Sequence, residues 1–100
     1  MASVTWTEPA HAQLEHILGY IALDKPAVAK RLATQIMSRV GRLAEFPDLG
    51  KAVPELAHPS YRQLWIKPCW VYYRIAEQAI FVLHVRRAER PLNPADLFIS

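Results

Sequence analysis

Four histidines and a single cysteine are the side chains of this sequence that most often carry acid–base, nucleophilic or metal chemistry. His11 and His16 are five residues apart, so they lack the i,i+4 spacing with which two histidines on one helix face bind a metal ion. His58 lies in a proline-rich segment, where we expect it to be solvated. Cys69 follows Pro68 at an expected turn and has no assignable catalytic partner, so we interpret it as a packed cysteine. We expect no metal site.

His84 is the one polar residue of the apolar segment AIFVLHV, residues 79–85. A histidine within a strand is usually hydrogen-bonded to a neighbour, and this is the interpretation we favour. The alternative is a catalytic base, because histidine changes its charge near neutral pH. The arginines that follow directly make this alternative worth testing.

Arginines are grouped around the ends of the expected strands. Arg86, Arg87 and Arg90 follow the apolar segment within five residues, whereas Arg62 begins an earlier strand and Arg74 lies in the strand between. In an antiparallel meander the start of one strand can lie near the end of its neighbour, so part of this set can form a cluster. Clustered guanidinium groups bind phosphates or carboxylates. The alternative is exposed ion pairing, worth about 0–1 kcal/mol a pair, with Glu77, Glu89 and Asp96.

Length and composition favour one globular domain over residues 1–100. Hydrophobic residues make up 52% of the chain, and its net charge of +3 resides entirely in residues 51–100. A basic half favours an acidic partner. A single cysteine excludes an internal disulfide, and no apolar segment is long enough for a membrane helix, so we expect a cytoplasmic protein. With only three glycines and no phosphate-binding loop, a nucleotide site is excluded and no cofactor is expected.

Hydrophobic periodicity predicts two helices followed by three strands. A short strand over residues 3–7 leads into a helix over about residues 9–23, with Thr7 as its cap. A second helix begins near Pro26 and ends before Pro47, and residues 47–60 are expected to be loop. The segments YRQLWI, WVYYRIAE and AIFVLHVRR then have the composition of strands.

These elements define an α+β fold with the order β-α-α-β-β-β. We expect a two-layer sandwich in which a helical hairpin packs on a small antiparallel sheet, with the N-terminal strand at one edge. The almost continuous apolar segment AIFVLHV indicates a central strand that is covered on both faces.

This element order, with the segment VYYRIAEQAIFVLHVRRAER, resembles the RelE/ParE superfamily of toxins from type II toxin–antitoxin systems. The resemblance extends from the strand around Trp6 to Arg87. It implies binding of a cognate antitoxin in a hetero-oligomer and a role such as plasmid stabilisation. RelE-like members are ribosome-dependent mRNA endonucleases, whereas ParE-like members inhibit DNA gyrase.

The resemblance is closer to the ParE-like branch. RelE-like nucleases usually carry a basic residue early in the third strand and a tyrosine near the C-terminus. Here the early third-strand position is Trp70 or Val71, and the tail PLNPADLFIS has no Tyr, His, Lys or Arg. A ParE-like toxin needs no catalytic residue of its own, because gyrase already cuts DNA.

We therefore predict a gyrase inhibitor, with two alternatives: an mRNA endonuclease that acts on the ribosome, and a binding module without toxicity. For the inhibitor, the predicted binding residues are Arg74, Arg86, Arg87 and Arg90. For the endonuclease, the candidate catalytic residues are Arg62, His84, Arg86 and Arg87, with the arginines stabilising the charge of the transition state.

Overall fold

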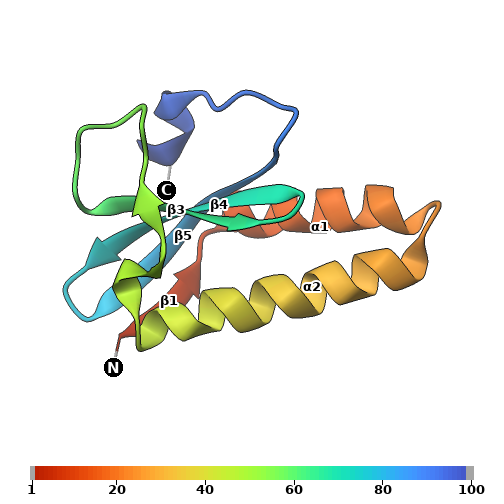
Figure 1. Cartoon of the computed structure of the whole chain (residues 1–100), viewed down its shortest axis with the longest axis horizontal. Helices are drawn as coiled ribbons and strands as arrows, with labels where there is room; N and C mark the ends of the chain where they lie inside the picture. The colour runs from red at the N-terminus through yellow and green to blue at the C-terminus, as the bar shows by residue number, and fades with distance from the viewer. Residues whose placement is uncertain (1, 99–100) are drawn as a thin grey trace.

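The computed structural model describes residues 2–98 of the chain (Figure 1). Its strands are β1 (Ser3–Trp6), β2 (Lys51–Ala52), β3 (Tyr61–Ile66), β4 (Cys69–Ala76) and β5 (Ala79–Arg87). Its α-helices are α1 (Glu8–Ala22) and α2 (Pro26–Gly41), and three 3-10 helices are η1 (Arg42–Ala44), η2 (Pro47–Leu49) and η3 (Pro94–Phe98).

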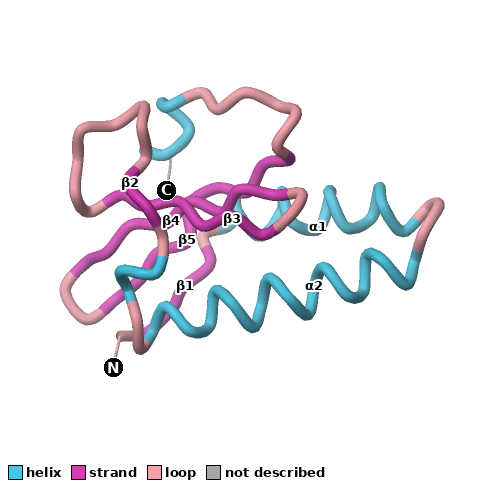
Figure 2. Tube along the Cα trace, viewed as in Figure 1, coloured by secondary structure: helices cyan, strands magenta, loops and turns pink. Residues whose placement is uncertain are grey.

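The two α-helices start within one residue of the positions that Thr7 and Pro26 predict. The Thr7 side chain accepts a hydrogen bond of 3.4 Å from the Ala10 amide, and Pro9 lies in the first turn of α1. Pro26 is the first residue of α2, where a missing amide hydrogen costs nothing. A tight turn joins the helices into the expected antiparallel hairpin (Figure 2). Neither helix of the described residues is long and apolar enough to cross a membrane.

The sheet has the order β1-β5-β4-β3-β2, so β1 and β2 form its edges. The α+β fold class and the edge position of the N-terminal strand are confirmed. In detail the sheet is mixed, because β1 pairs with β5 in parallel while the other pairs are antiparallel. The amino-acid composition of a strand does not indicate whether it pairs in parallel or antiparallel. The prediction of an antiparallel sheet was therefore wrong for β1. The segment at residues 47–60 also contains η2 and the two-residue strand β2 instead of loop alone.

The buried residues form two clusters. Helices α1 and α2 lie on one face of the sheet, and η3 lies on the other (Figure 1). The larger cluster lies between the helices and the sheet, where Ile17, Ile36 and Val82 pack together. The smaller cluster lies on the opposite face and includes Val53, Tyr72, Leu83 and Leu97. The C-terminal η3 supplies Leu97, and the segment after β2 supplies Val53. β5 is therefore covered on both faces, as its apolar sequence predicts.

A β-bulge shifts which residues of β5 face the core under the helices. Tyr73 pairs with Val82 and Tyr72 pairs with His84, which leaves Leu83 as an extra residue in β5. Val82 packs in the larger core and Leu83 in the smaller one. After the bulge the alternation is shifted by one residue, so that Val85 packs again in the core under the helices.

Candidate functional site

The C-terminal half of β5 extends beyond its neighbour β1 and meets helix α1 instead. β1 pairs with β5 only as far as Val82, whose carbonyl accepts hydrogen bonds from the amide and the hydroxyl of Thr7. Further along, the Gln13 side chain on α1 accepts a hydrogen bond of 2.8 Å from the Val85 amide. A helix side chain thus replaces the missing strand, and β5 enters a surface groove beside α1.

We call this surface hollow of about 770 Å³ the α1/β5 groove. It lies between one face of α1, the end of β5 and the segment that follows β5. Helix α1 contributes Gln13, His16 and Tyr20, and the remaining charged or ionisable lining residues are His84, Arg86, Arg87, Glu89, Arg90 and Asp96. Three arginines against two carboxylates make the groove basic, so its ligand is expected to be acidic.

Arg86 holds the backbone that shapes this groove. Its Nη1 donates hydrogen bonds to three carbonyl oxygens, at 2.6 Å for Arg90, 3.3 Å for Ala88 and 3.4 Å for Arg87. Its Nε donates to the hydroxyl of the buried Tyr72, at 2.8 Å. With these donors occupied, the guanidinium fixes the turn after β5. We therefore assign Arg86 a positioning role in this groove.

The guanidinium groups of Arg87 and Arg90 supply positive charge to the groove. The Arg87 guanidinium carbon is 5.8 Å from the centre of the Tyr20 ring, and its Nε is 2.8 Å from a carboxylate oxygen of Glu89. That ion pair is partly exposed, so it costs little to exchange for a ligand carboxylate or phosphate. Arg90 is exposed and forms no ion pair within residues 2–98.

His84 is the groove residue whose protonation is most affected by the fold. Burial lowers the pKa of His84; Asp96 opposes this effect, and Arg86 adds to it. The imidazole is therefore neutral at physiological pH. Its ring centre is 5.9 Å from that of Tyr72, and its Nδ1 is buried without a hydrogen-bond partner among the described residues.

Arg62 and Arg74 lie away from this groove. Arg74 pairs with Phe81, whereas Arg86 pairs with Trp70, so the two arginines are at opposite ends of the β4–β5 ladder. The Arg74 guanidinium lies 4.9 Å from the centre of the Phe81 ring. Arg62 donates a hydrogen bond of 2.9 Å to the Gly50 carbonyl and lies 3.6 Å from Asp48. Of the six candidate residues, the structure thus brings together His84, Arg86, Arg87 and Arg90.

The residues of α1 that line the groove were not predicted from the sequence, although their helical spacing is visible there. Gln13, His16 and Tyr20 are separated by three and four residues, which places them on one face of a helix. That face is polar and adjoins the stripe that packs in the core. Only the fold shows that it meets β5.

Cys69 is unsuited to nucleophilic chemistry. It is buried at the start of β4, and burial raises the pKa of its thiol, against a smaller lowering effect of Arg87. The thiol is therefore protonated at neutral pH. Within residues 2–98 there is also no group of three or more His, Cys, Asp or Glu side chains that could hold a metal ion.

Comparison with known proteins places this fold among toxins of type II toxin–antitoxin systems. The family described as "ParE toxin of type II toxin-antitoxin system, parDE" matches residues 4–92, which include both α-helices and all of the sheet except Ser3. The chain therefore belongs to the ParE toxin family.

Two relatives support this assignment. The chain is 34% identical over 91 residues to Toxin RelE2 from Caulobacter vibrioides, a match that covers 90% of this chain and 99% of that protein. It also resembles a chain of a solved chromosomal ParDE TA system from P. aeruginosa, with a TM-score of 0.73 and 26% identity. That match covers 89% of this chain and 98% of the other.

Proposed function

We propose that this ParE-family toxin acts in the cytoplasm by binding and inhibiting DNA gyrase, and that a cognate antitoxin neutralises it. The similarity to a chain of a ParDE TA system supports an antitoxin partner. The family match over residues 4–92 supports the gyrase target, because ParE-like toxins are the gyrase-directed branch of the superfamily.

The observation that carries this proposal is how the groove arginines are used. Arg86 is committed to three carbonyls and Tyr72, which leaves Arg87 and Arg90 to meet an acidic ligand. This arrangement suits the binding of a ligand through charge-assisted hydrogen bonds. Inhibition by such binding requires no catalytic residue on the toxin. In the same ladder Trp70 pairs with Arg86 at the start of β4, where an RNA-cleaving relative is expected to carry a basic residue.

The second candidate function is mRNA cleavage on the ribosome. The relative that is 34% identical carries the name RelE2. The neutral His84 lies beside a cluster of arginines, as a general base near a phosphate would. In this case Arg87 and Arg90 would stabilise the charge of the transition state.

Induction of the chain alone in growing bacteria separates these functions. We expect growth arrest with gyrase-linked DNA breaks and intact mRNA. Arg87→Ala combined with Arg90→Ala should relieve the arrest, and the control pair Lys30→Ala and Arg31→Ala, exposed on α2, should not. Cleaved mRNA with intact DNA would support the endonuclease instead. If the protein is folded but growth is normal, both toxin functions are excluded, and the remaining alternative is a binding module without toxicity.

A further inference from the structure

The second half of β5 has an unpaired edge inside the α1/β5 groove. β1 pairs with β5 only as far as Val82, and no other strand of residues 2–98 adjoins β5 on this side. The Val85 amide points into the groove, where it donates to the Gln13 side chain. The Ala88 amide points the opposite way and donates to the residue that precedes β4. Because backbone groups alternate along a strand, Arg87 presents its amide and carbonyl to the groove, as Val85 does.

Two backbone groups of this edge are free to bind a ligand. Among the described residues, neither the Val85 carbonyl nor the Arg87 amide forms a hydrogen bond. The Arg87 carbonyl, by contrast, accepts one of 3.0 Å from the Arg90 amide. In a parallel ladder, one residue of the neighbouring strand donates to the carbonyl before its partner and accepts from the amide after it. A residue opposite Arg86 would therefore pair with both free groups.

β1 makes this kind of parallel pairing with the first half of β5. The Ser3 amide donates to the Gln78 carbonyl and the Thr7 amide to the Val82 carbonyl, with hydrogen bonds of 3.1 and 3.0 Å. The chain then turns away into α1, which begins at Glu8. The groove of about 770 Å³ thus lies where a longer β1 would continue.

The side chains around this edge favour an acidic segment. Arg87 pairs with Cys69, which packs in the core under the helices, so the Arg87 side chain lies on the α1 face of the sheet. In an added strand, the residues on either side of the one opposite Arg86 would point to this same face. A carboxylate at either position could replace Glu89 as the ion-pair partner of Arg87. Arg90, which is exposed, adds a second positive charge to the groove.

We propose that the α1/β5 groove binds an extended, acidic segment of gyrase as a short strand parallel to β5. The segment would continue the line of β1 and pair with the Val85 carbonyl and the Arg87 amide, as in other strand additions to a sheet edge. A longer segment would also reach the Val85 amide, and there it would displace Gln13. A nucleic acid has no peptide backbone to pair with such an edge. The identity of the partner rests on the proposed function, whereas the pairing with β5 does not.

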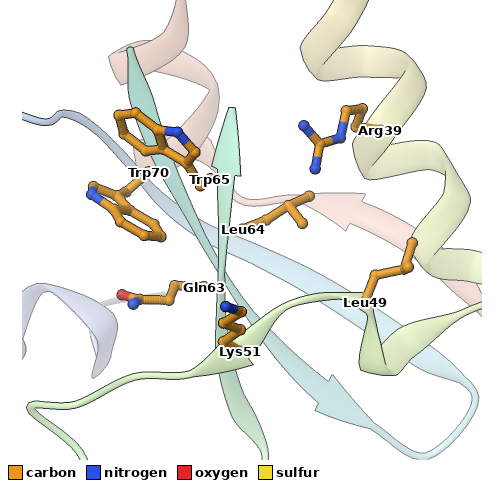
Figure 3. A pocket seen from close by; sticks show the side chains of 7 residues that line it. All are labelled: Arg39, Leu49, Lys51, Gln63, Leu64, Trp65 and Trp70. Atoms are coloured by element: carbon orange, nitrogen blue, oxygen red, sulfur yellow. The ribbon is translucent and has the colours of Figure 1, made fainter. Parts of the chain in front are cut away.

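Titration of the purified full chain with a synthetic peptide tests this pairing. The probe is a short capped peptide that alternates glutamate and valine, and its binding is followed by NMR. We expect saturable binding and slower hydrogen exchange of the Arg87 amide in the complex. Arg87→Glu combined with Arg90→Glu should weaken binding by about tenfold or more, because attraction becomes repulsion. The control pair is Arg39→Glu and Lys51→Glu, at residues that line a separate hollow beside β3, and it should leave binding unchanged (Figure 3).

Gln13 distinguishes an added strand from a ligand that binds through charge alone. Its side chain occupies the Val85 amide with a hydrogen bond of 2.8 Å. Gln13→Ala frees that amide, so we expect the peptide to bind about two- to tenfold more tightly, which is the net effect of one hydrogen bond. Gln35→Ala, at an exposed position of α2, is the matched control and should have no effect.

Three results would overturn the inference: no saturable binding, unchanged exchange of the Arg87 amide in the complex, or no gain in binding from Gln13→Ala. Tighter binding of an oligothymidylate than of the peptide would also overturn it and assign the groove to nucleic acid. The titration contains no gyrase. A chain that binds the peptide in this way but leaves supercoiling intact would fail only the proposed function. A chain that inhibits gyrase but binds the peptide without protecting Arg87 would fail only this inference.

Discussion

Arg86 Nε and the hydroxyl oxygen of Tyr72 are 2.8 Å apart, and this hydrogen bond joins the end of β5 to the buried centre of β4. Burial raises the pKa of the Tyr72 hydroxyl, so the group is neutral and accepts from a charged donor. The contact links the core to the groove. The same arginine fixes the carbonyls of the turn that carries Glu89 and Arg90.

Tyr72→Phe removes this hydrogen bond but keeps the buried ring. We expect the free energy of unfolding to fall by about 1.5–3 kcal/mol, as for other hydrogen bonds to charged groups. Urea denaturation followed by circular dichroism measures the change. The matched control is Tyr20→Phe, at a ring that is 64% exposed, and it should have almost no effect. Equal losses in the two variants would contradict the role of the Arg86–Tyr72 contact.

The hydroxyl of Tyr73 anchors the segment between α2 and β2. It donates a hydrogen bond of 2.6 Å to the Pro47 carbonyl and accepts one of 2.9 Å from the Gly50 amide. Tyr73→Phe leaves both partners unsatisfied, so we expect a loss of about 1–3 kcal/mol in the free energy of unfolding. Thermal and urea denaturation would show it, and a change below about 0.5 kcal/mol would contradict this anchoring role.

Gly50 is required for the same contact. A Cβ atom at this position would lie 2.7 Å from both the Gln63 carbonyl oxygen and the Tyr73 hydroxyl. Gly50→Ala should therefore destabilise the fold, because backbone must move. Gly41→Ala is the control, since its added Cβ meets nothing within 4 Å at the end of a helix. We expect Gly41→Ala to be neutral or stabilising in the same denaturation series, and the reverse order would refute the steric explanation.

The lowered pKa of His84 makes stability depend on pH. The unfolded chain binds a proton on this histidine at about pH 6.5, whereas the folded chain does so only at lower pH. The stabilisation is therefore complete above pH 6.5 and decreases as the pH falls toward the folded value. We expect urea midpoints to fall between about pH 6.5 and 5, and to fall less in His84→Gln. Parallel pH profiles of the two proteins would contradict the buried, neutral histidine.

Cys69 should be protected from thiol reagents by the fold. Burial both blocks access and raises the pKa of the thiol. At pH 8 we expect reaction with a disulfide reagent to be slower than in urea by about two orders of magnitude, because labelling requires opening of the core. Absorbance of the released thiolate gives both rates. Rapid labelling of the native chain would mean that β4 begins outside the core.

Much of the fold could be predicted from local sequence signals. Thr7, Pro9 and Pro26 indicate helix starts that the structure places at Glu8 and Pro26, within one residue of the expectation. The missed features are non-local. β2 is two residues long and is stabilised by pairing with β3, and the bulge at Leu83 depends on the register with β4.

The site was predictable only in part for the same reason. The sequence groups Arg86, Arg87 and Arg90, but it cannot show that Arg86 turns back to its own backbone. Nor can it show the strand register, which separates Arg74 from this cluster. The helix residues that complete the groove are about seventy positions away along the chain and meet β5 only through the hairpin.

We propose that the α1/β5 groove mediates inhibition of gyrase, and a supercoiling assay with purified gyrase measures this inhibition. We expect the purified chain to inhibit supercoiling and to accumulate cleaved DNA. Arg87→Glu combined with Arg90→Glu should weaken inhibition by about tenfold or more, because the groove loses its attraction for an acidic surface. Unimpaired supercoiling by gyrase, together with cleavage of mRNA on ribosomes by the same preparation, would show that gyrase is not the target.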